Sequence, residues 1–298
     1  MKHWMIFRIW MPLVGILFFA ANIKAENGLT FDAGKIRFAG IEMPYRAAHT
    51  SGNGQPSLVI YLHGSSSKGD DNEAQMKEAG IDSIAHYLEA KHMNALFLVP
   101  QCPSDKSWGG PMLGVLKSLI DMYVEDGTVG KDHLYIFGGS MGGTGTWSML
   151  SAYPGLFAAA MPVAGNPSKC DADNVALTPV YTVMGTSDRI MSAETTSDFI
   201  SELNDRNGMT AFDVEEGWTH EMTCIQSYTT PRIDWVFGDH HATSCIEKPE
   251  KGNLMVASTQ YYSINGCRLS EPPCKGAYIV RHVYEDGTVM SSIRMKGR

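Results

Sequence analysis

Short apolar runs alternate with longer amphipathic stretches along most of the chain. The apolar runs are nearly continuous, as in strands that are buried on both faces, and they predict strands at 57–64, 95–101, 133–139, 158–165, 179–185 and 210–217. The stretches between them predict helices near 72–91, 110–125, 142–152, 193–207 and 223–237. This alternation favours an α/β fold with a mostly parallel central sheet and helices on both faces.

The two flanks of this region have a different pattern. Residues 34–50 alternate between apolar and polar and predict an antiparallel hairpin that leads into the sheet. After a polar stretch at 241–251, residues 252–298 contain short apolar segments separated by Asn-Gly, Pro-Pro and Asp-Gly turns. We therefore expect one large α/β domain at 26–240, a linker at 241–251 and a small all-β C-terminal domain.

The first 25 residues have the pattern of a secretory signal peptide. Basic residues precede an apolar stretch at 9–21, and a short polar segment then ends at Ala25. A membrane anchor is the alternative, but Pro12 interrupts the run, which falls short of the ~20 residues that span a bilayer. We expect cleavage after Ala25, no stable membrane insertion afterwards, and a protein that is secreted, periplasmic or at the cell surface.

Composition and charge narrow the function classes. The chain has 298 residues, of which 44% are hydrophobic and 19% charged, an ordinary globular composition. Its formal net charge is −8, and removal of the signal peptide would delete Lys2, Arg8 and Lys24 but no acid, which gives −11. An acidic exported protein is a poor candidate for binding nucleic acid or an anionic membrane surface.

The six cysteines do not predict a metal site, because no Cys-x-x-Cys spacing and no His-rich segment accompanies them. Disulfides are allowed in an exported protein. Cys267 and Cys274 are a candidate local pair, and a bridge between Cys170 and Cys224 would connect two loops of the domain. Spacing alone does not fix the connectivity, so none of these pairs is assigned.

A glycine-rich motif stands where the strand at 133–139 ends and the next helix begins. Gly138-Gly139-Ser140-Met141-Gly142 matches Gly-x-Ser-x-Gly, the nucleophile elbow, in which a β-carbon on a flanking glycine would collide with the neighbouring strand or helix. A phosphate-binding loop is the rival, but no Gly-Lys-Ser/Thr follows and no Gly-x-Gly-x-x-Gly register fits. We predict that Ser140 is a nucleophile, with Gly138 and Gly142 as the motif glycines.

A serine nucleophile needs a base, and the base needs an acid that orients it. In the fold that carries this motif, the three follow in the order serine, acid, histidine. Asp188 lies just after the strand at 179–185, and His220 just after the strand at 210–217. Because the carboxyl ends of parallel strands meet at one edge of a sheet, we expect Ser140, Asp188 and His220 to form a catalytic triad.

Two backbone N–H groups should bind the oxyanion that forms on the attacked carbonyl. One is expected from Met141, the residue after the nucleophile. The other is expected from Ser65, in the loop after the first parallel strand, where Gly64 permits a sharp turn. His63 in the same loop is expected to be a hydrogen-bonded structural histidine rather than a base.

Two tryptophans follow strands near the expected cleft. Trp108 comes after the strand at 95–101, and Trp218 stands two residues before His220. Each is a candidate for substrate binding. Packing inside the domain is the alternative for both.

Several of these segments resemble exported esterases of the α/β-hydrolase superfamily. The resemblance is carried by "LHGSSSKGDDNEAQM", "FLVPQCPSDKSW", "HLYIFGGSMGGTGTW" and "VMGTSDRIM" followed by "GWTHEM", and it covers about residues 35–240. It is to poly(3-hydroxybutyrate) depolymerase-like proteins, feruloyl and acetylxylan esterases, and relatives of phospholipase/carboxylesterase type. The resemblance implies the α/β-hydrolase fold and a serine carboxylic-ester hydrolase with Ser140, Asp188 and His220 in the triad positions, without a metal or organic cofactor. The pattern departs at Thr223, where a tryptophan is usual.

The C-terminal segment is similar to the sorting-type β-domains of exported Bacteroidetes proteins, on the residues "YYSINGCRLSEPPCKGAYIV". A sorting domain implies contact with a secretion machinery, and a plain β appendage is the alternative. The whole sequence thus predicts an exported serine esterase that acts through an acyl-enzyme on acyl or feruloyl esters of carbohydrate, as small molecules or polysaccharides. One rival is a serine peptidase of prolyl-oligopeptidase type, although the chain has no propeller-sized segment. The other is a non-catalytic carbohydrate-binding surface protein, which predicts a broken triad, whereas every position is filled.

Overall fold

The computed structural model describes residues 19–24, 29–238, 240, 256–263, 268–273, 276–284 and 289–296. The chain divides into two compact units, residues 1–240 and 241–298. Of the predicted signal peptide only Phe19–Lys24 is described, as a strand paired with residues 30–33, so the sheet includes part of the segment expected to be removed. The predicted linker and the candidate pair of Cys267 and Cys274 lie outside the described residues. These three expectations stay predictions.

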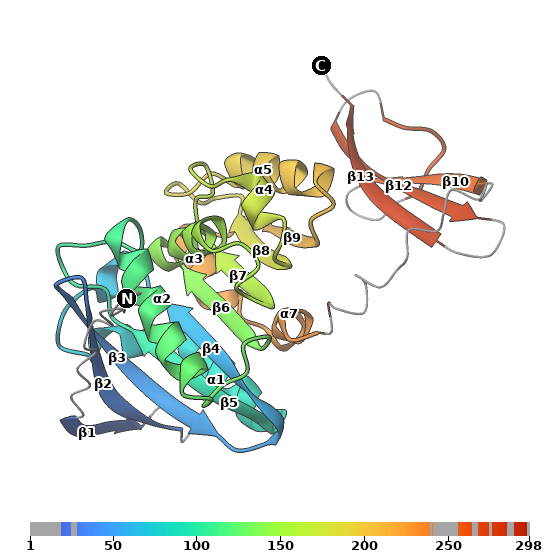
Figure 1. The fold of residues 1–298 in the computed structure, drawn as a ribbon. Helices are drawn as coiled ribbons and strands as arrows, with labels where there is room; N and C mark the ends of the chain where they lie inside the picture. The colour runs from blue at the N-terminus through green and yellow to red at the C-terminus, as the bar shows by residue number, and fades with distance from the viewer. Residues whose placement is uncertain are drawn as a thin grey trace, which may run out of the picture. The chain divides into compact units, whose positions relative to one another are not determined.

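The first unit is built on a nine-stranded sheet in the order β1-β2-β3-β5-β4-β6-β7-β8-β9 (Figure 1). Neighbours from β1 to β5 in this order pair antiparallel, and neighbours from β5 to β9 pair parallel. The predicted hairpin is β2 and β3, and each predicted sheet strand is present. The bounds are β1 Phe19–Lys24, β2 Thr30–Phe38, β3 Ile41–Thr50, β4 Asn53–Leu62, β5 Met93–Pro100, β6 Leu134–Gly139, β7 Ala159–Val163, β8 Val180–Gly185 and β9 Thr210–Glu215.

Helices cover both faces of this sheet, which confirms the predicted architecture. They are α1 Ala79–Ala90, α2 Pro111–Glu125, α3 Met141–Ala152, α4 Ala172–Val175, α5 Ala193–Asp205, α6 His220–Gln226 and α7 Thr230–Val236, with 3-10 turns η1 Ser65–Ser67 and η2 Ala74–Lys77. Alternate residues of β4 face opposite layers. Leu58, Ile60 and Leu62 pack with α2, α3 and α5, whereas Val59 and Tyr61 pack with α1 and α7. The continuous apolar runs in the sequence therefore reflect two separate cores.

Two of the predicted helices are each divided in two. The stretch at 223–237 becomes α6 and α7, because Pro231 lacks an N–H and stands in the first turn of a new helix. The stretch at 72–91 becomes η2 and α1, because Glu78 between them has an extended backbone, with φ −77° and ψ 126°. The side chain of Glu78 bonds to the loop after β4, a tertiary contact that periodicity does not reveal.

The second unit is a four-stranded antiparallel sheet in the order β11-β10-β12-β13. Its strands are β10 Val256–Ser263, β11 Arg268–Leu269, β12 Gly276–Tyr284 and β13 Val289–Lys296. The predicted all-β appendage is thereby confirmed as a fold, while its sorting role stays a prediction.

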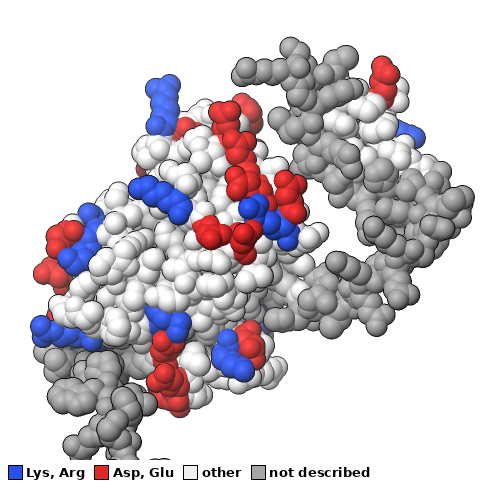
Figure 2. Space-filling model, turned by 45° about the horizontal axis from the view of Figure 1, so that its top comes forward, with Lys and Arg blue, Asp and Glu red and all other residues white. Residues whose placement is uncertain are grey.

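On the face shown in Figure 2, basic side chains lie in separate places while several acidic side chains gather. The described residues therefore form no continuous basic area there. A helix long and apolar enough to cross a membrane is also absent from the described part of the chain.

Candidate active site

Ser140 occupies a strained turn between strand and helix. Strand β6 ends at Gly139, helix α3 begins at Met141, and Ser140 between them has φ 57° and ψ −117°. A positive φ in a residue with a β-carbon costs about 1–3 kcal/mol and persists only where the surroundings impose it. Here the Ser140 N–H donates to the Val163 carbonyl oxygen at 3.0 Å, and Thr144 N–H donates to the Ser140 carbonyl oxygen at 3.0 Å.

The motif glycines permit close approaches of backbone to backbone. A β-carbon at Gly142 would lie 1.8 Å from the carbonyl oxygen of Leu62 in β4, and one at Gly138 would lie 2.4 Å from the carbonyl oxygen of Gly142. Both distances are far below van der Waals contact. The glycines thus let α3 begin against the end of β4, which is the reason that the motif itself predicted.

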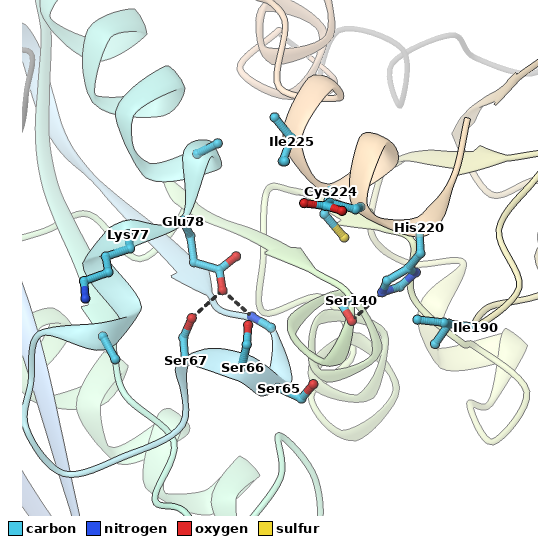
Figure 3. A pocket seen from close by; sticks show the side chains of 14 residues that line it. Ser65, Ser66, Ser67, Lys77, Glu78, Ser140, Ile190, His220, Cys224 and Ile225 are labelled. Carbon is cyan, nitrogen blue, oxygen red and sulfur yellow. Dashed lines mark hydrogen bonds between the residues drawn. The ribbon is translucent and has the colours of Figure 1, made fainter. Parts of the chain in front are cut away.

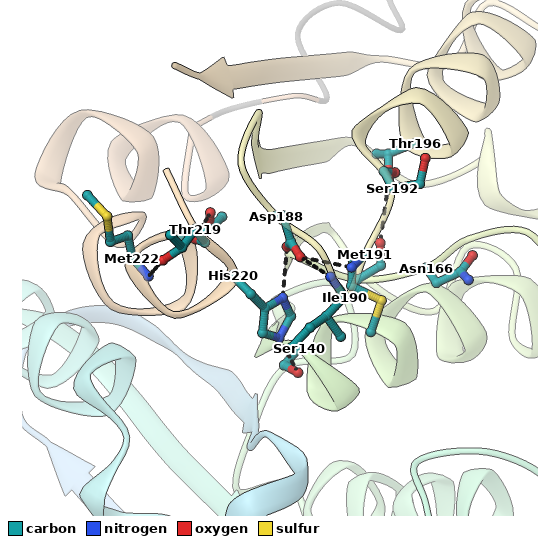
Figure 4. Close-up of polar contacts among 12 residues, drawn as sticks. Ser140, Asn166, Asp188, Ile190, Met191, Ser192, Thr196, Thr219, His220 and Met222 are labelled. Carbon is teal, nitrogen blue, oxygen red and sulfur yellow. Dashed lines mark hydrogen bonds and ion pairs between the residues drawn. The ribbon is translucent and has the colours of Figure 1, made fainter. Parts of the chain in front are cut away.

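The three expected triad residues are joined in one hydrogen-bond chain (Figure 4). His220 Nε2 lies 2.7 Å from Ser140 Oγ, and His220 Nδ1 lies 2.8 Å from Asp188 Oδ2. The Asp188 carboxylate can only accept, so Nδ1 donates and Nε2 is left as the acceptor for the serine proton. The Asp188 side chain is fully buried and that of His220 is 15% exposed, so the site is shielded but open at the histidine.

The loops after β8 and β9 hold the acid and the base. Asp188 Oδ1 accepts from the N–H groups of Ile190 and Met191 at 2.8 and 2.9 Å, so both carboxylate oxygens have partners. The N–H of Ser187 donates to the Trp218 carbonyl oxygen at 3.0 Å, which ties the two loops together. A β-carbon at Gly185 would lie 2.2 Å from that same oxygen, so the end of β8 must be glycine for the histidine loop to come this close.

Neither tryptophan lines the pocket at Ser140. Trp108 is 2% exposed, and its Nε1 donates to the carbonyl oxygen of His63 at 3.0 Å. Trp218 is half-buried, and the guanidinium of Arg232 lies 5.9 Å from its ring centre. Trp108 thus packs inside the domain against the segment that carries His63, and the substrate-binding role named for both tryptophans stays a prediction.

The loop after β4 presents a backbone N–H near the nucleophile. The N–H of Gly64 is already donated to Glu78 Oε1 at 3.1 Å, so it cannot bind an oxyanion. Ser65 begins η1, and Met141 begins α3. The first N–H groups of a helical turn have no acceptor within that turn, so the N–H groups of Ser65 and Met141 are not used inside η1 and α3. Their role as oxyanion donors stays a prediction.

His63 is a buried structural residue. It is fully buried, and Cys102 N–H donates to its Nε2 at 2.9 Å. A backbone N–H cannot accept, so Nε2 is unprotonated and Nδ1 donates to the Gly64 carbonyl oxygen at 2.6 Å. Burial lowers the pKa of His63 to about 4. The neutral ring therefore fixes the loop between β4 and Ser65.

The lowered pKa of His63 predicts a loss of stability in acid. Between about pH 6.5 and pH 4 the unfolded chain binds a proton on this ring and the folded chain does not, so the free energy of unfolding falls as the pH falls, by up to about 3 kcal/mol. Urea unfolding at pH 7 and pH 4.5 measures this loss, which His63→Gln should reduce. An NMR titration that places the His63 pKa near 6.5 would contradict it.

A pocket of about 690 Å³ opens beside Ser140 (Figure 3). Ile190 and Ile225 stand at it with 69% and 50% exposure, and Glu78 forms part of the opposite wall. No motif in the sequence marks these three residues as part of a site. The described lining is Gly64, Ser65, Ser66, Ser67, Ala74, Lys77, Glu78, Ala79, Ser140, Ile190, His220, Glu221, Cys224 and Ile225.

The described cysteines are free thiols, so the candidate bridge between Cys170 and Cys224 is absent. Burial raises the pKa of Cys224 to about 12, which keeps this thiol beside the pocket protonated at neutral pH. The described residues also contain no group of three or more His, Cys, Asp or Glu side chains that could hold a metal ion.

The whole arrangement is similar to solved structures with the α/β-hydrolase fold. A thermostable esterase matches with 25% identity and a TM-score of 0.62, over 74% of this chain and 62% of that one. A cold-adapted esterase from an Arctic intertidal metagenomic library matches with 12% identity and a TM-score of 0.55, over 74% and 98% of the two chains. The feruloyl esterase module from Clostridium thermocellum matches with 13% identity and a TM-score of 0.51, over 76% and 89%.

No protein-family model matches the sequence, and a search of curated proteins finds no match. The chain spans less than two thirds of the length of the thermostable esterase. These similarities and the sheet order show that the first unit has the α/β-hydrolase fold.

Proposed function

We propose that this chain is an exported serine carboxylic-ester hydrolase that acts through an acyl-enzyme. The observation that carries the proposal is the hydrogen-bond chain from Ser140 Oγ to His220 to the buried Asp188, anchored on a strained turn. A strained residue and a fully connected chain of this kind persist where function requires them. Esterases among the similar structures support the same class of reaction.

The site would work by acyl transfer. His220 Nε2 takes the proton of Ser140 as Oγ attacks the ester carbonyl, and the carbonyl electron pair moves onto oxygen. The N–H groups of Met141 and Ser65 stabilise this oxyanion. His220 then returns the proton to the leaving alkoxide. Water attacks the acyl-enzyme under the same base, and the acid is released while Ser140 regains its proton.

The substrate proposed is an acyl or feruloyl ester of a carbohydrate. Its support is the resemblance of the sequence to carbohydrate esterases, and the feruloyl esterase module among the structural neighbours is consistent with it. Cleavage of peptides by the same triad is the rival, and a non-catalytic carbohydrate-binding protein is opposed by the intact triad. Export through the N-terminal segment, and contact of residues 252–298 with a secretion machinery, belong to the same proposal.

A fluorophosphonate probe tests the reaction class directly. We expect it to label Ser140 in the wild-type protein and not in Ser140→Ala, because the hydrogen bond to His220 makes this hydroxyl the reactive one. Turnover of acetyl, feruloyl and longer acyl esters, each as a sugar ester and as a simple alkyl ester, ranks the substrates, with a matching peptide amide as the comparison. Absence of both labelling and ester turnover in the wild type would overturn the proposed function.

A further inference from the structure

Glu78 lies in the wall of the active-site pocket and is bound to the loop after β4. Its Oε1 accepts two hydrogen bonds, from Gly64 N–H at 3.1 Å and from Ser67 Oγ at 2.7 Å (Figure 3). The chain leaves helical geometry at Glu78 itself, and α1 begins only at the next residue. The helical segment is therefore interrupted at the residue whose side chain makes this contact.

These two hydrogen bonds fix the donor that the oxyanion would use. Gly64 precedes the turn η1 and Ser67 ends it, and the turn closes through Ser67 N–H to the Gly64 carbonyl oxygen at 3.3 Å. Ser65 lies between them, so one carboxylate oxygen holds both ends of the segment that carries its N–H. An oxyanion donor must be in place before the charge develops, and a displacement of 1 Å can cost about 100-fold in rate.

Glu78 also lies where the acid part of an ester would extend. His220 returns its proton to the leaving alcohol, so the alcohol is on the His220 side, and Figure 3 shows Glu78 across Ser140 from His220. A methyl group at Gly64 would lie 3.4 Å from Glu78 Oε1 and 3.6 Å from Ser140 Cβ. Gly64 therefore stands between the Glu78 carboxylate and Ser140, and both residues line the same pocket.

No ion pair neutralises Glu78 within the described part of the chain. Lys77 lines the same pocket but is exposed to solvent, and it forms no ion pair with Glu78. The phenol of Tyr61 is fully buried nearby, and burial together with the charge of Glu78 raises its pKa well above the usual value, so it stays neutral. The negative charge thus acts on whatever enters this side of the pocket.

We propose that Glu78 is the positioning residue of the oxyanion loop, and that its charge makes the site select against esters whose acid part is anionic. This inference rests on the proposed function. One carboxylate oxygen holds the loop through its two hydrogen bonds, and the negative charge of the carboxylate repels an anionic acyl group. The two effects can be separated, because glutamine keeps the accepting oxygen and loses the charge.

The experiment compares three substrates of equal chain length, the p-nitrophenyl esters of hexanoate, of adipate through one carboxyl, and of 6-aminohexanoate. The variants are Glu78→Gln, Glu78→Ala and Ser67→Ala, and Glu73→Gln is the matched control, an exposed glutamate outside the pocket. Kinetic constants are measured together with the thermal midpoint of each variant. Ser67→Ala removes one of the two hydrogen bonds and leaves the charge.

With Glu78→Ala, kcat on hexanoate should fall about 10- to 100-fold, and with Ser67→Ala by a smaller factor. The kcat of Glu78→Gln on hexanoate should stay within about threefold of wild type. Its adipate-to-hexanoate ratio of kcat/KM should rise by roughly tenfold, and its 6-aminohexanoate-to-hexanoate ratio of kcat/KM should fall, because the negative charge is gone. Glu73→Gln should match the wild type. Unchanged hexanoate turnover in folded Glu78→Ala and Ser67→Ala, or an unchanged adipate ratio in Glu78→Gln, would overturn the inference while wild-type turnover keeps the proposed function intact. A wild type without any ester turnover would overturn both.

Discussion

Replacing His220 with alanine is expected to lower kcat for ester hydrolysis by about 10⁶-fold, the loss that follows removal of a general base from a complete triad. In the structure the imidazole Nε2 lies 2.7 Å from Ser140 Oγ, and a serine hydroxyl without a base is almost wholly protonated at neutral pH. Single-turnover and steady-state rates with p-nitrophenyl acetate measure the loss. The fold should survive, because Asp188 Oδ1 keeps its two backbone donors.

The control for this substitution is His86→Ala, which removes an exposed imidazole from α1. It should leave kcat within about twofold, because surface substitutions away from a site have small effects. If His220→Ala retained more than about a tenth of wild-type activity while remaining folded, another group would have to serve as the base, and the triad assignment would be wrong.

The sheet could be predicted from the sequence because the burial of each strand determines its pattern of apolar residues. A strand such as β4 is buried on both faces, so its apolar run is continuous and short, and the neighbouring amphipathic segments fill the layers on either side. Helix continuity was harder to predict. At Pro231 the sequence holds a local signal for the break, whereas at Glu78 the cause is a contact with Gly64, distant in the chain.

The triad positions could be predicted because chain order and strand ends constrain them together. Asp188 and His220 each follow a strand whose carboxyl end meets the same edge, so proximity follows from topology. The tryptophans and Glu78 obey no such rule. Whether Trp108 faces the pocket or the core depends on the path of its loop, and residue type does not encode that path.

Replacing Asp188 with asparagine is expected to lower kcat by about 10⁴-fold with little change in fold. The reason lies in the two N–H groups of Ile190 and Met191, which donate to Oδ1 at 2.8 and 2.9 Å. An asparagine must turn its carbonyl oxygen toward these donors, because an amide NH₂ there would face two N–H groups. Its NH₂ then faces His220 Nδ1, which has to accept, so the ring proton moves to Nε2.

A ring protonated at Nε2 cannot take the proton of Ser140, so the variant holds the wrong tautomer in an intact site. NMR of the imidazole at neutral pH should detect the proton on Nε2 in Asp188→Asn and on Nδ1 in the wild type. Asp188→Ala is the matched comparison, since it removes the carboxylate without imposing a tautomer, and it should lose about 10⁴-fold as well. If the kcat of Asp188→Asn stayed within tenfold of wild type, Asp188 would not orient His220. Asp188 would then have to be removed from the proposed catalytic triad.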